Sequence, residues 1–261
     1  MNLSEKINQS QVLKQSSKSR IILANIEDLK EKIIIKELDH TLYTVYKQLS
    51  GIQNQHFPDI YQVEQTESHL LVAEEYIEGK TIAAILSERT FSLEEAIDIM
   101  LQICSGMVSL HYATPPIIHR DLTPWNLLLT QEHLLKIIDF DAARIYKPGA
   151  ACDTRRLGTA EYAPPEQFGF SQTDARSDIY SMGVLLYELV YCKSFHQTGP
   201  SEFIENRKYR KSNKIINRCT MFSPSQRYQS IEELKRALLL SLPFPLRYHY
   251  CHSKFKTKKR G

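Results

Sequence analysis

Two short polar segments constrain this chain more than any other part of its sequence. Residues 119 to 126 read His-Arg-Asp-Leu-Thr-Pro-Trp-Asn, and Asp139-Phe140-Asp141 follow thirteen positions after Asn126. Asp121 could accept a proton from a hydroxyl group, while Asn126 and Asp139 carry the oxygen atoms that Mg²⁺ prefers. The spacing predicts a proton acceptor and two metal-facing groups on neighbouring loops around a bound nucleotide. The alternative is an ordinary loop entering a buried strand, with Asp121 in a turn and Asn126 as a cap.

The length of 261 residues suits one domain built of two lobes. Short β-branched runs in the first ninety residues predict a small sheet, with strands at 12–15, 20–26, 32–37, 60–63 and 70–74. A helix is expected after the third strand, where Leu42, Val45, Leu49 and Ile52 recur at helical spacing. The remainder should be mainly helical, with helices at 92–108, 178–190 and 230–240, a strand pair at 127–129 and 134–138, and a long loop at 141–165.

The overall composition is that of an ordinary globular protein. A net charge of +3 is too small to predict nucleic-acid binding. Five basic residues crowd the last eight positions of the C-terminal tail, 243–261: Lys254, Lys256, Lys258, Lys259 and Arg260. This cluster predicts a solvated end or, as an alternative, a contact with anionic lipid. Five widely spaced cysteines predict reduced thiols. With neither an apolar leader nor a spanning segment in the sequence, we expect a cytoplasmic protein.

Several further segments match a known family in the right order. Ile33-Ile34-Ile35-Lys36, Glu75-Tyr76-Ile77, the run from Gly158 to Glu166, and Asp178-Ile179-Tyr180 follow one another with the two opening segments among them. Together they resemble the protein kinases, and most closely the bacterial Hanks-type serine/threonine protein kinases. The resemblance implies an α+β, bilobal protein-kinase-like fold, with a domain at 8–242, an N-lobe at 8–75, a hinge at 75–79 and a C-lobe at 80–242.

The resemblance also implies a role for individual residues. ATP and Mg²⁺ would be the cofactors and proteins the substrates, with Asp121 as base and Asn126 and Asp139 on the metal. Lys36 would hold phosphates, and Glu75, Ile77 and Leu128 would contact the rest of ATP. Three residues are expected to be structural: Asp178 beneath residues 119–126, which correspond to the family's catalytic loop, and Arg227 paired with Glu166.

The chain departs from the family pattern mainly around the nucleotide. Gln15-Ser16-Ser17-Lys18-Ser19 replaces the glycine-rich turn, and Ile34 replaces a small residue above adenine. The helix at 41–48 contains no acid, so we expect Glu74 to pair with Lys36; the alternative is that Glu74 bonds a backbone amide or water.

Two departures lie in the catalytic segments. Thr123 stands where a lysine usually contacts the transferred phosphate. Asp141 replaces glycine and is expected to face solvent, with Mg²⁺ binding as the alternative.

Arg120 is expected to bind a phosphate on the long loop, and Thr154, flanked by two arginines, is the candidate acceptor. Thr159 is expected to contact Asp121 instead. Two other functions stay open: a pseudokinase that binds nucleotide or acts as a scaffold, and a small-molecule phosphotransferase. The Ser/Thr preference rests on the resemblance alone, and the sequence predicts no oligomeric state.

Overall fold

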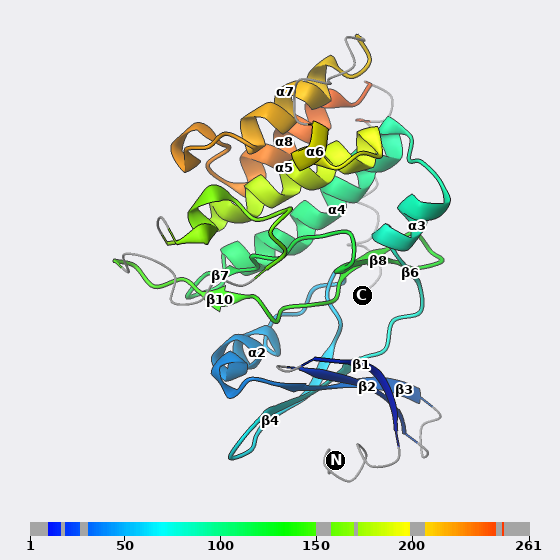
Figure 1. Cartoon of the computed structure of the whole chain (residues 1–261), viewed down its shortest axis with the longest axis vertical. Helices are drawn as coiled ribbons and strands as arrows, with labels where there is room; N and C mark the ends of the chain where they lie inside the picture. The colour runs from blue at the N-terminus through cyan, green and yellow to red at the C-terminus, as the bar shows by residue number, and fades with distance from the viewer. Residues whose placement is uncertain are drawn as a thin grey trace, which may run out of the picture.

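The structure, a computed structural model, describes residues 10–16, 19–26, 31–149, 158–169, 172–198, 207–243 and 247. A small sheet with one helix beside it forms one end of the molecule, and a bundle of helices forms the other (Figure 1). The bilobal kinase-like fold expected from the sequence is therefore confirmed. Most of the C-terminal tail lies outside the described residues.

The small lobe is an antiparallel sheet of five strands in the order β1-β2-β3-β5-β4. Its strands are β1 (Gln11–Gln15), β2 (Arg20–Ile26), β3 (Glu31–Leu38), β4 (Ile60–Gln65) and β5 (Leu70–Glu75). Alternate residues of β5 face opposite sides, so Leu71 and Ala73 join one buried cluster and Leu70 and Val72 the other. Asp39 caps a short 3₁₀ turn (His40–Leu42), which leads into α2 (Tyr43–Leu49).

The larger lobe is organised around two long helices, α4 (Leu93–His111) and α5 (Ala175–Tyr191). Ser92 and Glu95 form the capping box expected at the start of α4, a feature that contributes about 1 kcal/mol. Gly183 lets α5 approach α7 (Arg210–Cys219) closely, because an added Cβ would lie 2.4 Å from the Cβ of Cys219. The described residues of this lobe also form α3 (Ile82–Glu88), α6 (Phe195–Thr198) and α8 (Ile231–Ser241), with 3₁₀ turns at Pro165–Phe168 and Pro224–Gln226.

Short strands connect the two lobes and carry the polar loops. β6 (Lys80–Thr81), β8 (Leu127–Leu129) and β9 (Leu135–Ile137) form one small sheet, and β7 (Ile117–Ile118) pairs with β10 (Arg144–Ile145). The β8–β9 hairpin places the catalytic loop and the 139–141 segment next to each other, because these segments lie at its two open ends. Local strand pairing thus explains how the two opening motifs meet.

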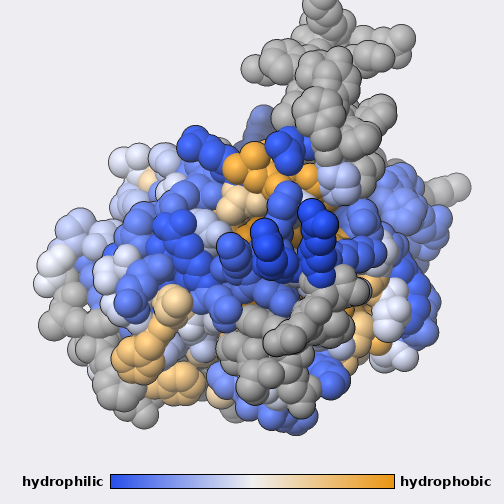
Figure 2. All heavy atoms as spheres, turned by 90° about the horizontal axis from the view of Figure 1, so that it is seen from above, coloured by the Kyte–Doolittle hydropathy of each residue, from blue (hydrophilic) through white to orange (hydrophobic). Residues whose placement is uncertain are grey.

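The surface at the helical end is mostly hydrophilic, with a patch of hydrophobic side chains among the polar ones (Figure 2). Among the described residues, no helix is both long and apolar enough to cross a membrane.

Most expected elements are present, with small changes of boundary. The five strands of the first lobe, the β8–β9 pair and the helices at α2, α4 and α8 lie where the sequence predicts them. The α5 helix begins at Ala175, earlier than expected, because the side chain of Asp174 accepts a hydrogen bond from the amide of Arg176 and caps it. Helices α3, α6 and α7 and the two-residue strands β6, β7 and β10 are not predicted by the sequence patterns.

Candidate active site

A cavity of about 290 Å³ lies between the two lobes. Its apolar walls include Ile21, Ile34 and Leu128, and its polar inner end includes Lys36, Asn126 and Asp139. The volume is near the lower end of the range of roughly 300 to 1,000 Å³ seen for small-molecule sites. Apolar walls suit a flat base, and carboxylate and amide oxygens suit Mg²⁺, so these residues fit a magnesium nucleotide. Glu74, Glu75 and Ile77, each expected at an ATP site, also line this cavity.

Lys36 and Glu74 form a buried ion pair within the sheet. Lys36 pairs with Val72 across β3 and β5, and Glu74 lies two residues further along β5, so both side chains occupy the same face. Lys36 Nζ lies 2.8 Å from Glu74 Oε1 and donates to the carbonyl of Ile138 at 2.8 Å. The pairing expected from the sequence is therefore present, and the alternative partners for Glu74 are not needed.

Carboxylates around Lys36 set its protonation. Burial by itself lowers the pKa of Lys36, but the carboxylates of Glu74, Asp139 and Asp141 outweigh it and raise the pKa overall. Burial raises the pKa of Glu74, and Lys36 offsets part of that increase. The carboxyl groups of Glu74 and Asp139 line this end of the cavity, where a bound cation would be stabilised.

Asp121 is held by two donors. The backbone amide of Thr159 donates to Asp121 Oδ1 at 2.7 Å, and Asn126 Nδ2 donates to Asp121 Oδ2 at 2.9 Å. Asn126 Nδ2 also donates to the carbonyl of Asp121 at 2.9 Å, which leaves Asn126 Oδ1 as the atom able to bind a cation. Thr159 thus contacts Asp121 as expected, through its backbone.

The 139–141 segment corrects one expectation. Asp141 does not face solvent: it is half-buried, and Tyr46 on α2 donates to Asp141 Oδ1 at 3.1 Å. The backbone amide of Asp141 donates to Asp139 Oδ1 at 2.9 Å. Burial and the neighbouring Asp139 carboxylate raise the pKa of Asp141 to about 7. Burial also opposes ionisation of Asp139, but Lys36 and the amide of Asp141 lower its pKa overall.

Asp178, at the start of α5, fixes the backbone of the catalytic loop. Its two carboxylate oxygens accept from the amides of His119 at 3.0 Å and Arg120 at 2.8 Å. His111 Nε2 lies 2.8 Å from Asp178 Oδ2. Burial favours protonation of this acid, yet the contacts with His111 and the loop lower its pKa. The bonds hold Arg120 in a left-handed conformation with φ of 70°.

The segment from Gly158 to Glu166 packs directly against the catalytic loop. Gly158 has φ of 103°, and an added Cβ would lie 2.7 Å from the carbonyl of Arg120. Gln167 follows this segment and donates to the same carbonyl at 2.9 Å. A glycine is therefore required at 158 for both conformation and space.

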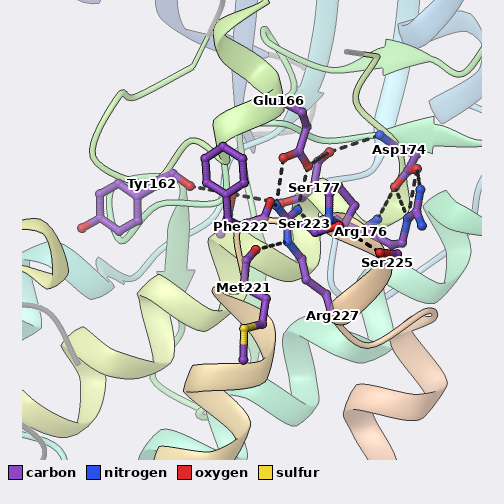
Figure 3. A network of polar contacts seen from close by, with 12 residues as sticks. Tyr162, Glu166, Asp174, Arg176, Ser177, Met221, Phe222, Ser223, Ser225 and Arg227 are labelled. Atoms are coloured by element: carbon purple, nitrogen blue, oxygen red, sulfur yellow. Dashed lines mark hydrogen bonds and ion pairs between the residues drawn. The ribbon is translucent and has the colours of Figure 1, made fainter. Parts of the chain in front are cut away.

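Glu166 and Arg227 form the second buried ion pair (Figure 3). Arg227 Nη1 and Nη2 donate to the two Glu166 oxygens at 2.7 and 2.8 Å. Three backbone carbonyls, those of Arg176, Met221 and Phe222, accept the other N–H groups. The pair expected from the sequence joins the end of the segment from Gly158 to Glu166 to the bundle of helices.

Additional contacts reinforce the connection beside the hinge. Glu75 Oε2 pairs with Lys136 Nζ at 2.8 Å, and Lys136 also donates to the carbonyl of Phe57 at 3.0 Å. His56 Nδ1 lies 2.9 Å from the carbonyl of Leu135. Residues 54–57 follow α2 in the sequence but bond to the larger lobe.

Among the described residues expected at the site, Arg120, Asp121 and Thr123 do not line the cavity. Thr123 is buried, with an exposed fraction of 1%, and does not line the cavity. Thr154 and Lys18 lie outside the described residues. Conversely, sequence reasoning missed Tyr46, His111 and Lys136, whose partners lie 95, 67 and 61 positions away.

Comparisons with known proteins agree with this geometry. The profile of the protein kinase domain family matches residues 8–242. The chain therefore belongs to the protein kinase domain family.

Curated relatives come from bacteria and from an animal. Serine/threonine-protein kinase A of Synechocystis is 30% identical over 191 residues, or 63% of this chain and 37% of the relative. Serine/threonine-protein kinase pkn2 of Myxococcus xanthus is 29% identical, covering 65% and 22%. Myosin light chain kinase 2 of the rat is 31% identical, covering 65% and 27%. The chain thus spans well under half the length of these relatives.

Proposed function

We propose that this chain transfers the terminal phosphate of ATP to serine or threonine hydroxyls of protein substrates. The observation that carries the proposal is the set of contacts around Asp121, whose carboxylate is oriented by Thr159 and Asn126. A carboxylate fixed in this way can accept a hydroxyl proton as the new bond to phosphorus forms. The relatives named above support protein hydroxyls as acceptors.

The expected site residues that line the cavity have separate roles in this reaction. Asp139 and Asn126 would hold Mg²⁺, which when bound neutralises charge on the phosphates. Lys36, kept in place by Glu74 and the carbonyl of Ile138, would bind the phosphates. The backbone of Glu75 and Ile77 would bond the base, and Leu128 would pack against it.

Regulation would act through the segment between β10 and Gly158. We infer that a phosphate on Thr154 binds Arg120, which is buried beside the catalytic loop. Burial lowers the pKa of Arg144 and the charge of Arg120 adds to that decrease, so these two arginines would favour an added anion. Incubation with Mg·ATP followed by mass analysis of the 145–166 peptide tests this: a peptide without phosphate counts against Thr154.

The supporting contacts would serve structure and not chemistry. Three side chains would hold the catalytic loop and the segment from Gly158 to Glu166 in place: Asp178, Glu166 and Arg227. Thr123 would contribute to the same loop from its buried position.

A cytoplasmic location, where ATP is available, is part of the proposal, as is weak contact of the basic tail with anionic lipid.

Transfer of labelled phosphate from ATP to casein, with phosphoamino-acid analysis, tests the proposed reaction. Asp121→Asn should lower the rate on the order of a hundredfold or more. Nucleotide binding by that variant should stay within about twofold, because Asp121 is not among the residues lining the cavity. Binding of Mg·ATP by the unmodified protein without any transfer to protein would refute the proposed activity.

A further inference from the structure

Tyr46 is a polar residue on the buried face of a short helix. Val45, Tyr46 and Leu49 are the buried residues of α2, and Tyr46 has an exposed fraction of 0%. Its ring lies 5.9 Å from Lys36 Nζ, and its hydroxyl donates to Asp141. The ring thus packs beside the lysine while the hydroxyl reaches the loop that carries the metal-binding acid.

The ordinary interpretation is that Tyr46 only fills the core. A buried phenol needs a hydrogen-bond partner, however, so its hydroxyl contributes only when a suitable acceptor is built opposite it. Asp141 supplies that acceptor, and it is itself a half-buried acid next to Asp139. Two acids placed side by side repel each other, and the hydroxyl of Tyr46 stabilises the second one where it lies.

Lys36 does not provide the link between α2 and the loop. Its partners are Glu74 on β5 and the carbonyl of Ile138. Residues 40–49 contain no Asp or Glu that could pair with this lysine. The contact between Tyr46 and Asp141 therefore joins α2 to the metal-binding segment.

We propose that Tyr46 is a positioning residue for Asp139 and acts through Asp141. The hydroxyl fixes the Asp141 carboxylate, and the amide of Asp141 in turn fixes Asp139 Oδ1 at 2.9 Å. Correct placement of α2 would thereby favour binding of a magnesium nucleotide. The proposal rests on the proposed function, because it concerns how that reaction's metal is held.

A double-mutant cycle with Tyr46→Phe and Asp141→Ala tests the proposal. The probe is ADP, titrated with Mg²⁺ and again with EDTA in place of Mg²⁺. Trp125, the only tryptophan, lines the cavity and reports binding through its emission. Tyr43→Phe on the same helix is the matched control.

Tyr46→Phe should weaken Mg²⁺-dependent ADP binding by about five- to tenfold, the effect of losing one intramolecular hydrogen bond. Binding in EDTA should change less than about twofold, and Tyr46→Phe should add less than about twofold to Asp141→Ala. Hydrogen exchange at the Asp141 amide, measured without ligand, should become faster in Tyr46→Phe. Tyr43→Phe should change none of these quantities.

Each opposite result has a definite meaning. An equal effect of Tyr46→Phe with and without Asp141, or with and without Mg²⁺, would make Tyr46 a packing residue and overturn the proposal. If the unmodified protein binds Mg·ADP and Tyr46→Phe binds it equally well, only this proposal fails. If the unmodified protein binds no nucleotide, the proposed function fails and this inference fails with it.

Discussion

Replacing Arg227 with Lys should lower the free energy of unfolding by about 3 kcal/mol, although the positive charge is kept. Arg227 is fully buried, and its five N–H groups make five hydrogen bonds, two to Glu166 and three to backbone carbonyls. A lysine has three donors at most, so at least two acceptors lose their bonds. Each such loss costs about 1.5 kcal/mol when charge is involved.

Urea unfolding followed by circular dichroism measures this difference. Arg218→Lys is the matched control, because Arg218 pairs with Glu233 at 2.6 Å but both side chains are more than one third exposed. That exposed pair should contribute less than about 1 kcal/mol. Arg227→Met, which leaves the buried Glu166 carboxylate without its cation, should cost about 3 to 5 kcal/mol. Equal, small losses for Arg227→Lys and Arg218→Lys would refute the argument from buried donors.

Three further predictions concern the site. Glu74→Gln should weaken Mg·ADP binding, measured by calorimetry, about tenfold. Glu37→Gln is the control, because Glu37 pairs with Arg20 on the same sheet but both side chains are partly exposed, and it should not weaken binding. Equal effects of the two substitutions would contradict the role of Glu74. Gly158→Ala should lower kcat more than about tenfold, because the added Cβ would clash with the backbone carbonyl of Arg120. Gly149→Ala is the control, because Gly149 also has a positive φ, 83°, but open space around it, and it should leave kcat unchanged. Similar kcat values for the two variants would disprove the steric argument. The pKa of Asp178 is lower in the folded protein than in the unfolded chain, so its contribution to the free energy of unfolding is complete above the unfolded pKa of about 3.9 and is lost as the pH falls through the folded pKa. Unfolding measured at a series of pH values should therefore show a smaller decrease in the free energy of unfolding at acid pH for Asp178→Asn than for the unmodified protein. An unchanged pH profile in Asp178→Asn would contradict this role of Asp178.

Local patterns predicted the fold because its elements carry their own signals. The capping box of α4 and the alternation of β5 are set by neighbouring residues, so the sequence contains them directly. Helix α3 has seven residues, too few to establish a period, and α7 buries only Ser212, Ile215, Ile216 and Cys219 among polar neighbours. Such short or mainly polar helices are fixed by packing and not by their own sequence.

The same limit applies to the site. The pair of Lys36 with Glu74 was predictable because the helix at 41–48 offers no acid and Glu74 is an acid directly before the expected hinge. The error at Asp141 had a different origin, since its partner Tyr46 lies 95 positions away and resembles an ordinary core residue of an apolar stripe. Only the packing of α2 against the loop brings the two together.

The bonds of residues 54–57 to the larger lobe have a mechanical consequence. The small sheet is attached both by the covalent hinge and by this segment, whose His56 and Phe57 carbonyls accept from Ile137 and Lys136. Because these two attachments lie close together beside the hinge, we expect the small sheet to rotate about them, which would break and re-form the bonds that Lys36 and Tyr46 make to the larger lobe. We expect the opposite side of the sheet, at the edge strand β1 and its neighbour β2, to move away from the larger lobe when nucleotide enters or leaves. The side of the sheet next to the hinge, at β4 and β5, would stay in contact with the larger lobe while nucleotide binds and is released.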